Sequence, residues 1–312
     1  MFTLTRVASA NMTRILMYHN FSMAGETGPD AVSTADLRRQ LAYLRRHFNV
    51  VSLPGVIERL NTGKPQDRLT VALTIDDGRR NCFEFLFPLL KEFEIPATFF
   101  VVSSFIRGDD WIWTDKVLWL SEQPSRPREL SSDRIEASFA NLNRLRPETR
   151  TASINAIAAQ MAVSIPVQAP PKYAPCSWSE LREMADSGLM EIGSHTVTHP
   201  ILASITEQES WNELTLSRAQ IEEGLGRPVV SFCFPNGKHG DYRQSQLRQV
   251  RDAGYAGAVV AEFGMVANGQ DPYELPRIGV SGQSDVLSFS KSLDGVEYYQ
   301  ARLQKSCRLQ TR

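Results

Sequence analysis

Two short motifs place carboxylates and imidazoles where apolar, strand-like runs give way to turns. Asp76 and Asp77 directly follow one such run, and His195 and His199 follow another. Two imidazoles and one carboxylate form a three-ligand set for a divalent metal such as zinc, and they leave a coordination position open for water or substrate. The remaining carboxylate can then act as a base. Gly78 permits a sharp turn in which the two aspartates diverge around one site.

Neither motif is specific alone. An isolated Asp-Asp-Gly is usually an exposed turn, and an isolated His-x-x-x-His is usually a surface or core pair. Their occurrence together, each after a strand-like run, favours a shared metal site. His195 and His199 are also two of only five histidines in the chain.

The same residues resemble the polysaccharide deacetylases, also called the NodB-homology or carbohydrate esterase family 4 enzymes. Thr74-Ile-Asp-Asp-Gly78 resembles the first motif of that family, and Ser194-His-Thr-Val-Thr-His199 resembles the second. The similarity runs from about Ile15 to about Val280 and includes the segments 15–19 and 95–100. It implies a metal-dependent hydrolase of linear amide C–N bonds, which removes acetyl groups from N-acetylated sugars in a polysaccharide, an oligosaccharide or a lipid-linked sugar.

The resemblance and the ligand chemistry together suggest a role for each of the four motif residues. Asp77, His195 and His199 would hold a divalent metal, with zinc as the default and iron, cobalt or nickel as alternatives. The metal would activate water and polarise the acetyl carbonyl. Asp76 would take the proton from that water as it attacks, as the first aspartate of the family motif does.

The third motif departs from the usual pattern of the family. Its position is occupied by Phe232-Cys-Phe-Pro-Asn-Gly237. Pro235 and Asn236 are expected to contact the substrate, and the backbone amide of Asn236 is the candidate donor to the tetrahedral oxyanion. Cys233 stands where an arginine is commonest, and Asn236 stands where an aromatic residue is usual.

The late histidine that usually protonates the leaving amine has no counterpart after His239. His19, at the end of the first strand-like run, could supply this proton, as is proposed for relatives with a rearranged motif order. Arg277, at the end of the last run, could orient Asp76 through charge-assisted hydrogen bonds. The alternatives are a core histidine bonded to backbone for His19 and a plain structural ion pair for Arg277.

Strand-like runs alternate with helical patterns along the chain, which indicates an α/β fold with a parallel sheet. Seven strands are expected, and seven is the number in the distorted (β/α) barrel of the family that the chain resembles. Helices that open with the capping patterns Ser177-Trp-Ser-Glu180 and Thr206-Glu-Gln-Glu209 lie between strands. Every motif falls at the carboxyl end of a strand, where barrel active sites lie. The expected strands are 14–18, 70–75, 97–102, 189–193, 229–234, 255–260 and 275–280.

One long segment interrupts this alternation. We read the chain, 1–312, as a single deacetylase-like domain with a helical insertion at 106–176 that caps or borders the cleft, because so long a connection is rarely structureless. Its tryptophans are expected to anchor it to the barrel in preference to stacking on sugars. A C-terminal helix is expected at 284–307.

The composition is typical of an enzyme that is not associated with nucleic acid or membrane. The net charge of −1 lacks the basic excess that nucleic acid or anionic lipid would favour, and no apolar run approaches the length of a membrane helix. The start, at Met1 or Met12, shows no secretory signal, and the four cysteines form no zinc-ribbon or disulfide pattern. These features favour the cytoplasm, and the resemblance to the deacetylase family implies an association with the synthesis of cell-surface polysaccharide. The oligomeric state stays open.

Two other functions fit the same residues. One is hydrolysis of a non-sugar amide or ureide with the same metal machinery. The other is a non-catalytic carbohydrate-binding protein derived from such an enzyme, although a binding protein would not need a base beside its metal. The loops decide between substrates, and their shapes do not follow from one sequence.

Overall fold

Seven parallel strands close into a barrel, as predicted. The computed structural model describes residues 2–23, 31–131, 134–280, 282, 285–296 and 298–299. The first barrel strand pairs with the second on one side and with the last on the other, which closes the ring. In order around the barrel the strands are β1 (Arg14–Tyr18), β5 (Thr70–Ile75), β6 (Ala97–Val101), β7 (Met190–Ser194), β8 (Ser231–Cys233), β9 (Gly257–Phe263) and β10 (Leu275–Gly279).

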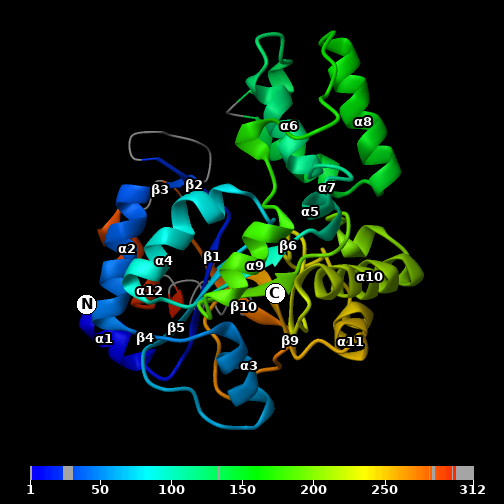
Figure 1. The fold of residues 1–312 in the computed structure, drawn as a ribbon. Helices are drawn as coiled ribbons and strands as arrows, with labels where there is room; N and C mark the ends of the chain where they lie inside the picture. The colour runs from blue at the N-terminus through cyan, green and yellow to red at the C-terminus, as the bar shows by residue number, and fades with distance from the viewer. Residues whose placement is uncertain are drawn as a thin grey trace, which may run out of the picture.

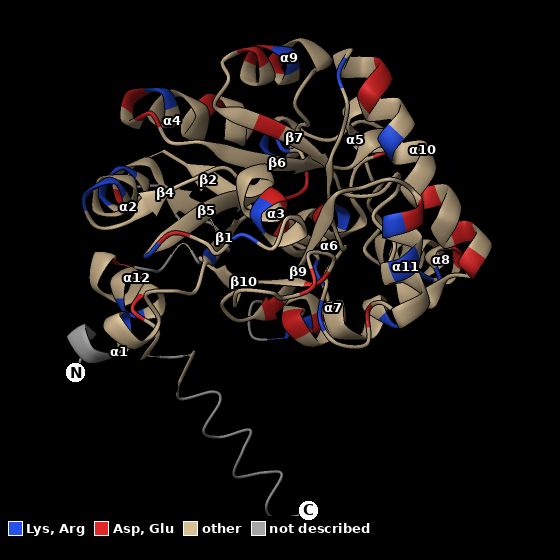
Figure 2. Ribbon diagram, turned by 90° about the horizontal axis from the view of Figure 1, so that it is seen from below, with Lys and Arg blue, Asp and Glu red and all other residues tan. Residues whose placement is uncertain are grey.

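Burial explains why these strands read as apolar runs. Every residue of β5, β6 and β8 is buried, because helices cover the outer face of a parallel barrel and side chains fill its interior. The helix α3 (Leu53–Asn61) closes one end, where Leu53 and Ile57 pack with Ile15, Ala72 and other strand residues (Figure 2). The cleft described below lies at the opposite end, beyond the carboxyl ends of the strands.

Helices surround the barrel, and acidic and basic residues are interspersed along those such as α9 and α10 (Figure 2). The two capping boxes predicted at Ser177 and Thr206 are present, and Gly226 ends α10 in a left-handed conformation with φ of 70°. The helices outside the insertion are α1 (Phe2–Ala8), α2 (Thr34–His47), α3, η1 (Cys82–Leu86), α4 (Phe87–Phe93), α5 (Ser103–Arg107), α9 (Trp178–Asp186), η4 (Leu202–Ser204), α10 (Glu207–Leu225), α11 (Gln244–Asp252) and α12 (Val286–Leu293).

Three short strands were not predicted. β2 (Asn20–Ser22) and β3 (Ala31–Ser33) form a small separate sheet, and β4 (Asn49–Val50) pairs with the start of β5. Segments of two or three residues are too short to show a periodic pattern.

The segment between α5 and α9 forms a helical lobe on one side of the barrel (Figure 1). The lobe has its own apolar core, which includes Val117, Leu142 and Ile154. A second cluster, which includes Phe105, Trp111 and Tyr173, joins the lobe to α5. The lobe consists of α6 (Trp113–Glu122), η2 (Arg128–Leu130), α7 (Ile135–Asn143), α8 (Pro147–Gln160) and η3 (Pro171–Tyr173).

The predicted C-terminal helix of 284–307 is interrupted. The helix α12 begins after its N-cap Asp285 and ends at Leu293, because the chain turns at Gly295 with φ of 81°. Residues 300–307 of the predicted span lie outside the described part of the chain. Among the described residues, no helix combines the length and the apolar character needed to cross a membrane.

Candidate active site

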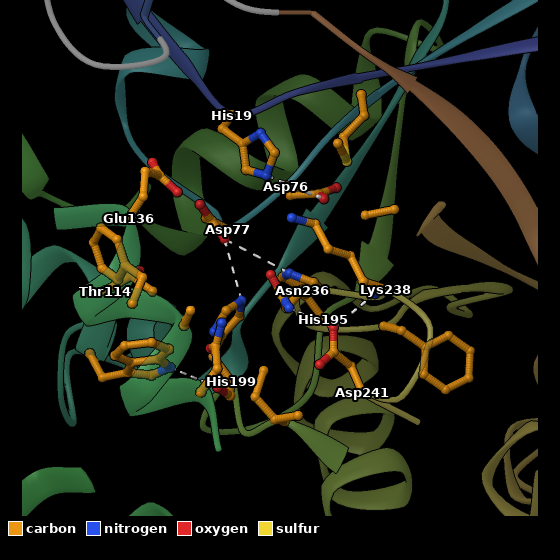
Figure 3. Close-up of a pocket in the computed structure, with 18 of the residues that line it drawn as sticks. His19, Asp76, Asp77, Thr114, Glu136, His195, His199, Asn236, Lys238 and Asp241 are labelled. Atoms are coloured by element: carbon orange, nitrogen blue, oxygen red, sulfur yellow. Dashed lines mark hydrogen bonds and ion pairs between the residues drawn. The ribbon is translucent and has the colours of Figure 1, made fainter. Parts of the chain in front are cut away.

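Asp77, His195 and His199 converge on one point at the carboxyl end of the barrel (Figure 3). The Oδ1 atom of Asp77 lies 3.8 Å from Nε2 of His195 and 3.7 Å from Nε2 of His199. Bonds of about 2.0–2.2 Å from one ion to each of these atoms would span such separations. All three side chains are buried. The three residues therefore fit a mononuclear divalent metal.

The protonation of the two imidazoles also suits metal binding. The carbonyl oxygen of Cys233 lies 2.7 Å from Nδ1 of His195, so this nitrogen carries the proton and Nε2 keeps a lone pair toward Asp77. Burial lowers the pKa of His195, and burial together with the neighbouring His195 lowers the pKa of His199 to about 3. Both rings are therefore neutral at neutral pH, and the buried Nδ1 of His199 has no hydrogen-bond partner among the described residues.

The backbone around the site adopts conformations that side chains usually avoid. Asp77, Thr196, His199 and Asn236 have φ angles of 83°, 71°, 56° and 57°. Positive φ in non-glycine residues, and in a β-branched threonine above all, is uncommon and clusters at functional sites. The Thr196 hydroxyl accepts a hydrogen bond from the His199 amide at 3.0 Å, which fixes the loop that carries both histidines.

Asp76 is held from the other side by a buried arginine. Arg277 on β10 donates to both carboxylate oxygens, at 2.8 and 2.7 Å, and also to the Thr74 hydroxyl at 3.0 Å. Burial alone would raise the pKa of Asp76, but the charge and hydrogen bonds of Arg277 outweigh it and hold the pKa below its ordinary value. Asp76 is therefore ionised at neutral pH, as a base must be.

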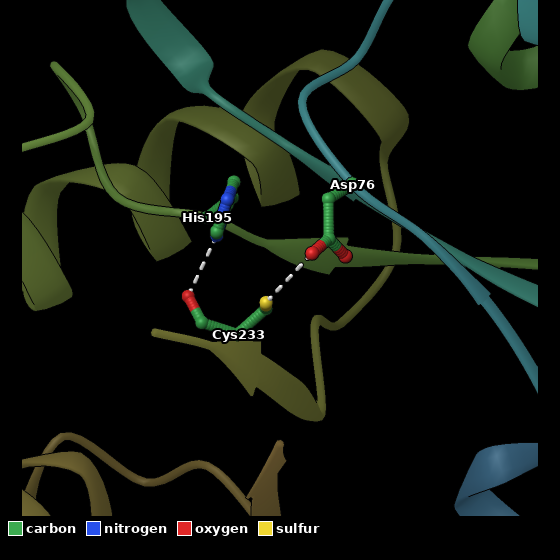
Figure 4. A group of neighbouring side chains, drawn as sticks. All are labelled: Asp76, His195 and Cys233. Carbon is green, nitrogen blue, oxygen red and sulfur yellow. Dashed lines mark hydrogen bonds between the residues drawn. The ribbon is translucent and has the colours of Figure 1, made fainter. Parts of the chain in front are cut away.

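Cys233 completes the surroundings of Asp76. Its Sγ lies 3.5 Å from Oδ2 of Asp76 and accepts a hydrogen bond from Arg277 at 3.2 Å (Figure 4). Asp76, His195 and Cys233 form a second group with metal-ligand spacing. Both oxygens of Asp76 already accept hydrogen bonds from Arg277, and burial raises the pKa of the Cys233 thiol. The Asp77 group is thus the better metal site.

A buried ion-pair network behind Asp77 did not emerge from the sequence. Arg79 donates to Oδ2 of Asp77 and also to both oxygens of Asp115, which lies in the first turn of α6. Asp115 is fully buried. The two oxygens of the Asp77 carboxylate therefore have different partners: Oδ1 faces the histidines, and Oδ2 accepts a hydrogen bond from Arg79. The only hint in the sequence is the cationic Arg79 directly after Gly78, since nothing marks Asp115 as its partner.

Of the remaining predicted residues, His19 and Asn236 line the cleft and Pro235 does not. His19 lines the cleft with its Nε2 atom 3.8 Å from Oδ2 of Asp76, and its side chain is 37% exposed. Asn236 also lines the cleft, and its side-chain amide donates to Asp241 at 2.5 Å. Pro235 is buried and is not among the residues that line the cleft, and its predicted contact with substrate stays a prediction. It accepts a hydrogen bond from the amide of Gly237 and so shapes the turn.

The cleft has a volume of about 780 Å³, and the helical lobe forms one of its walls. The lobe contributes residues of α6 and α7, among them Glu136, which projects toward the site from above Thr114 (Figure 3). Trp111 and Trp113 are buried and anchor the lobe, as expected. The indole N–H of Trp113 donates to the His199 carbonyl at 3.3 Å. The lobe therefore borders the site, and its tryptophans support the barrel loops.

Comparison with known proteins identifies the family. Residues 63–258 match the family model described as polysaccharide deacetylase, and the chain belongs to that family. A stretch of 167 residues is 36% identical to the poly-β-1,6-N-acetyl-D-glucosamine N-deacetylase of Escherichia coli K12. The stretch covers 53% of this chain but only 18% of the E. coli protein.

Solved structures share the fold at low sequence identity. The deacetylase PplD of Streptococcus pyogenes, solved in complex with acetate, superposes with a TM-score of 0.63 at 17% identity, over 90% of this chain and 98% of that one. IcaB from Ammonifex degensii superposes with a TM-score of 0.64 at 19% identity, over 91% and 97%. Both likenesses establish the barrel fold.

Proposed function

We propose that the protein is a metal-dependent deacetylase of N-acetylated sugars. The observation that carries the proposal is the convergence of Asp77, His195 and His199 beside an ionised Asp76 in one open cleft. The name of the E. coli relative supports a substrate that contains N-acetylglucosamine. A polysaccharide, an oligosaccharide and a lipid-linked sugar all carry this group.

The metal and the residues of the chain have different roles in the proposed reaction. A bound divalent ion, with zinc as the default, supplies an activated water and polarises the acetyl carbonyl. Asp76 accepts the proton of the water as its oxygen adds to the carbonyl carbon, while Arg277 keeps the carboxylate in position. The Asn236 backbone amide donates to the oxyanion that develops.

His19 supplies the proton that the leaving amine requires. The C–N bond breaks as the amine nitrogen takes this proton, which yields acetate and a free amino sugar. His19 suits the role because it lines the cleft and its Nε2 atom lies 3.8 Å from Oδ2 of Asp76.

Acetate release tests the proposal directly. The full chain, loaded in turn with zinc, cobalt, nickel and iron, should release acetate from one class of a panel of N-acetylglucosamine oligomers, with β-1,4 and β-1,6 linkages, and lipid-linked N-acetyl sugars. The Asp76→Asn variant is the matched control for contaminating activity. A metal-loaded protein that releases no acetate from any of them, but hydrolyses other amides or ureides, would contradict the sugar substrate.

We expect one divalent ion per chain, bound through Asp77, His195 and His199. His195→Ala and His199→Ala should each lose most of the metal, because two ligands seldom retain a divalent ion against competing buffer. His47→Ala is the control, since His47 ends α2 away from the cleft. Metal analysis of all four proteins checks this, and equal occupancy throughout would rule the site out.

The Arg79–Asp115 pair should affect the metal affinity of this site, because Arg79 contacts the Asp77 oxygen that faces away from the histidines. With Asp115 replaced by Asn, the charge of Arg79 faces Asp77 and the ion without compensation. We therefore expect Asp115→Asn to weaken metal binding by about 10–100-fold, the usual effect of losing such a supporting partner. Competition with a chromophoric chelator measures the affinity.

The double variant Arg79→Met/Asp115→Leu distinguishes an effect of charge on metal affinity from an effect of misfolding. It removes one positive and one negative charge together, so the net charge beside Asp77 returns to that of the wild type. Metal affinity should recover most of the loss seen in Asp115→Asn. Wild-type affinity in Asp115→Asn itself would show that the pair only fixes the lobe to the barrel.

A further inference from the structure

A second cavity, of about 330 Å³, lies between the helical lobe and the barrel. Its walls are the segment from α5 to the start of α6, one side of α8 and the loop that follows β7. Trp113 lines both this cavity and the catalytic cleft, so the two spaces adjoin across its ring. The proposed deacetylation does not use this cavity.

Arg150 on α8 is buried in the wall of this cavity and forms no salt bridge among the described residues. The residue is 3% exposed, and its guanidinium lies over the Trp113 ring at 4.5 Å from the centroid. The Nη1 atom is buried and has no hydrogen-bond partner among the described residues. Burial lowers the pKa of Arg150 to about 10, so it remains charged at neutral pH.

The other charges that line the cavity are already neutralised. Asp110 pairs with Lys116 at 2.6 Å, and Asp109 pairs with Arg107 at 3.1 Å. Neither carboxylate forms a salt bridge with Arg150, so its guanidinium has no direct ionic partner in the cavity lining.

A buried charge without a counter-charge is costly, by several kcal/mol in general. The Trp113 face offsets only part of this cost, since a cation–π contact contributes about 0.5–2 kcal/mol. Glu148, two residues earlier on the surface, raises the pKa of Arg150 through its charge, but its salt bridge is with Arg146, at 3.7 Å. An anion that enters the cavity would supply both the missing charge and the missing acceptors.

We propose that this cavity binds a small oxyanion, a phosphate or a carboxylate, with Arg150 as its principal ligand. Thr151 and Asn155 line the same cavity from α8 and offer a hydroxyl and an amide as further donors. A guanidinium matches the paired oxygens of either group. The oxyanion comes either from free phosphate or from an acidic group on a saccharide.

Saturable binding of inorganic phosphate and of glucuronate to the full chain tests the proposal. At constant ionic strength, one of the two should raise the thermal unfolding midpoint of the wild type progressively, and calorimetry should give a single site. Phosphate would indicate a free anion, and glucuronate an acidic sugar. Arg150→Met should weaken binding by about 10-fold or more, the factor expected for a lost charge-assisted hydrogen bond. Neither readout requires the metal or the deacetylase activity.

Two further variants keep the test decisive. Arg146→Met lies on the same helix segment but removes an arginine that is 48% exposed and paired with Glu209, so it should bind the anion like the wild type. Asn155→Asp supplies a carboxylate to the cavity, so it should raise the unfolding midpoint without added anion and abolish the response to phosphate or glucuronate. No saturable response in the wild type, or equal responses in Asn155→Asp and the wild type, would overturn the proposal.

Discussion

Replacing Asp76 with Asn is expected to lower the deacetylation rate by about 10²–10⁴ while the metal content stays at the wild-type level. The geometry separates the two aspartates. Asp76 turns both oxygens toward Arg277, whereas Asp77 turns Oδ1 toward His195 and His199. An amide in place of the Asp76 carboxylate preserves the shape of the side chain but cannot accept the proton of water.

Asp77→Asn is the matched comparison, and it should lose both metal and rate. Turnover by each variant under saturating substrate, with metal analysis of the same preparation, separates the two roles. Loss of metal in Asp76→Asn with metal retained in Asp77→Asn would mean that the roles are reversed.

The pH dependence of the base follows from its surroundings. Arg277 holds the pKa of Asp76 below its ordinary value despite burial, so the ionised form persists as the pH falls past the value of about 4 that is usual for aspartate. We therefore expect no loss of rate from protonation of Asp76 between pH 5 and 7. A loss there that Asp76→Asn no longer shows would place the carboxylate in a different environment.

Much of the barrel and the positions of the motif residues could be read from the sequence. Buried parallel strands appear in the sequence as continuous apolar runs, and the residues that directly follow them must lie at the carboxyl end of the barrel. This rule alone brings Asp76 and His195 together across more than one hundred intervening residues. Arg277 lies within the last barrel strand, β10, and its side chain reaches Asp76 from there.

The features that the sequence did not predict depend on contacts between distant segments, and such contacts leave no periodic pattern in the sequence. Asp115 meets Arg79 only because the lobe packs against the barrel, and the two residues are 36 positions apart in a sequence that does not specify that contact. Pro235 lies in the third motif but is absent from the cleft lining, and the positive φ of Asn236 beside it could not be read from the sequence. The predicted C-terminal helix is interrupted after Leu293 because Gly295 turns the chain, although the surrounding residues favour a helix.

Few histidines are candidates for the group that protonates the leaving amine. Of the five histidines, His195 and His199 form the proposed metal site and His47 lies outside the cleft lining. His239 was set aside from the sequence as part of a loop, yet it does line the cleft. Its backbone amide donates to Glu262, whereas the imidazole of His19 lies beside Asp76. His19 is therefore the better donor, and His239→Ala is its matched control.

His19→Ala is expected to retain the metal and to lower turnover of an N-acetyl sugar by about 10²–10⁴, the range for a removed general acid. An activated acetyl ester should be affected far less, because a good leaving group departs without a proton. The ratio of the two losses is the decisive measurement, since a merely structural defect would reduce both equally. A pH–rate profile of the wild type should also fall at high pH, with a limb that His19→Ala lacks and His239→Ala keeps. Wild-type turnover of the N-acetyl sugar by His19→Ala would assign the proton to another donor, and the same loss in His239→Ala alone would identify that donor as His239.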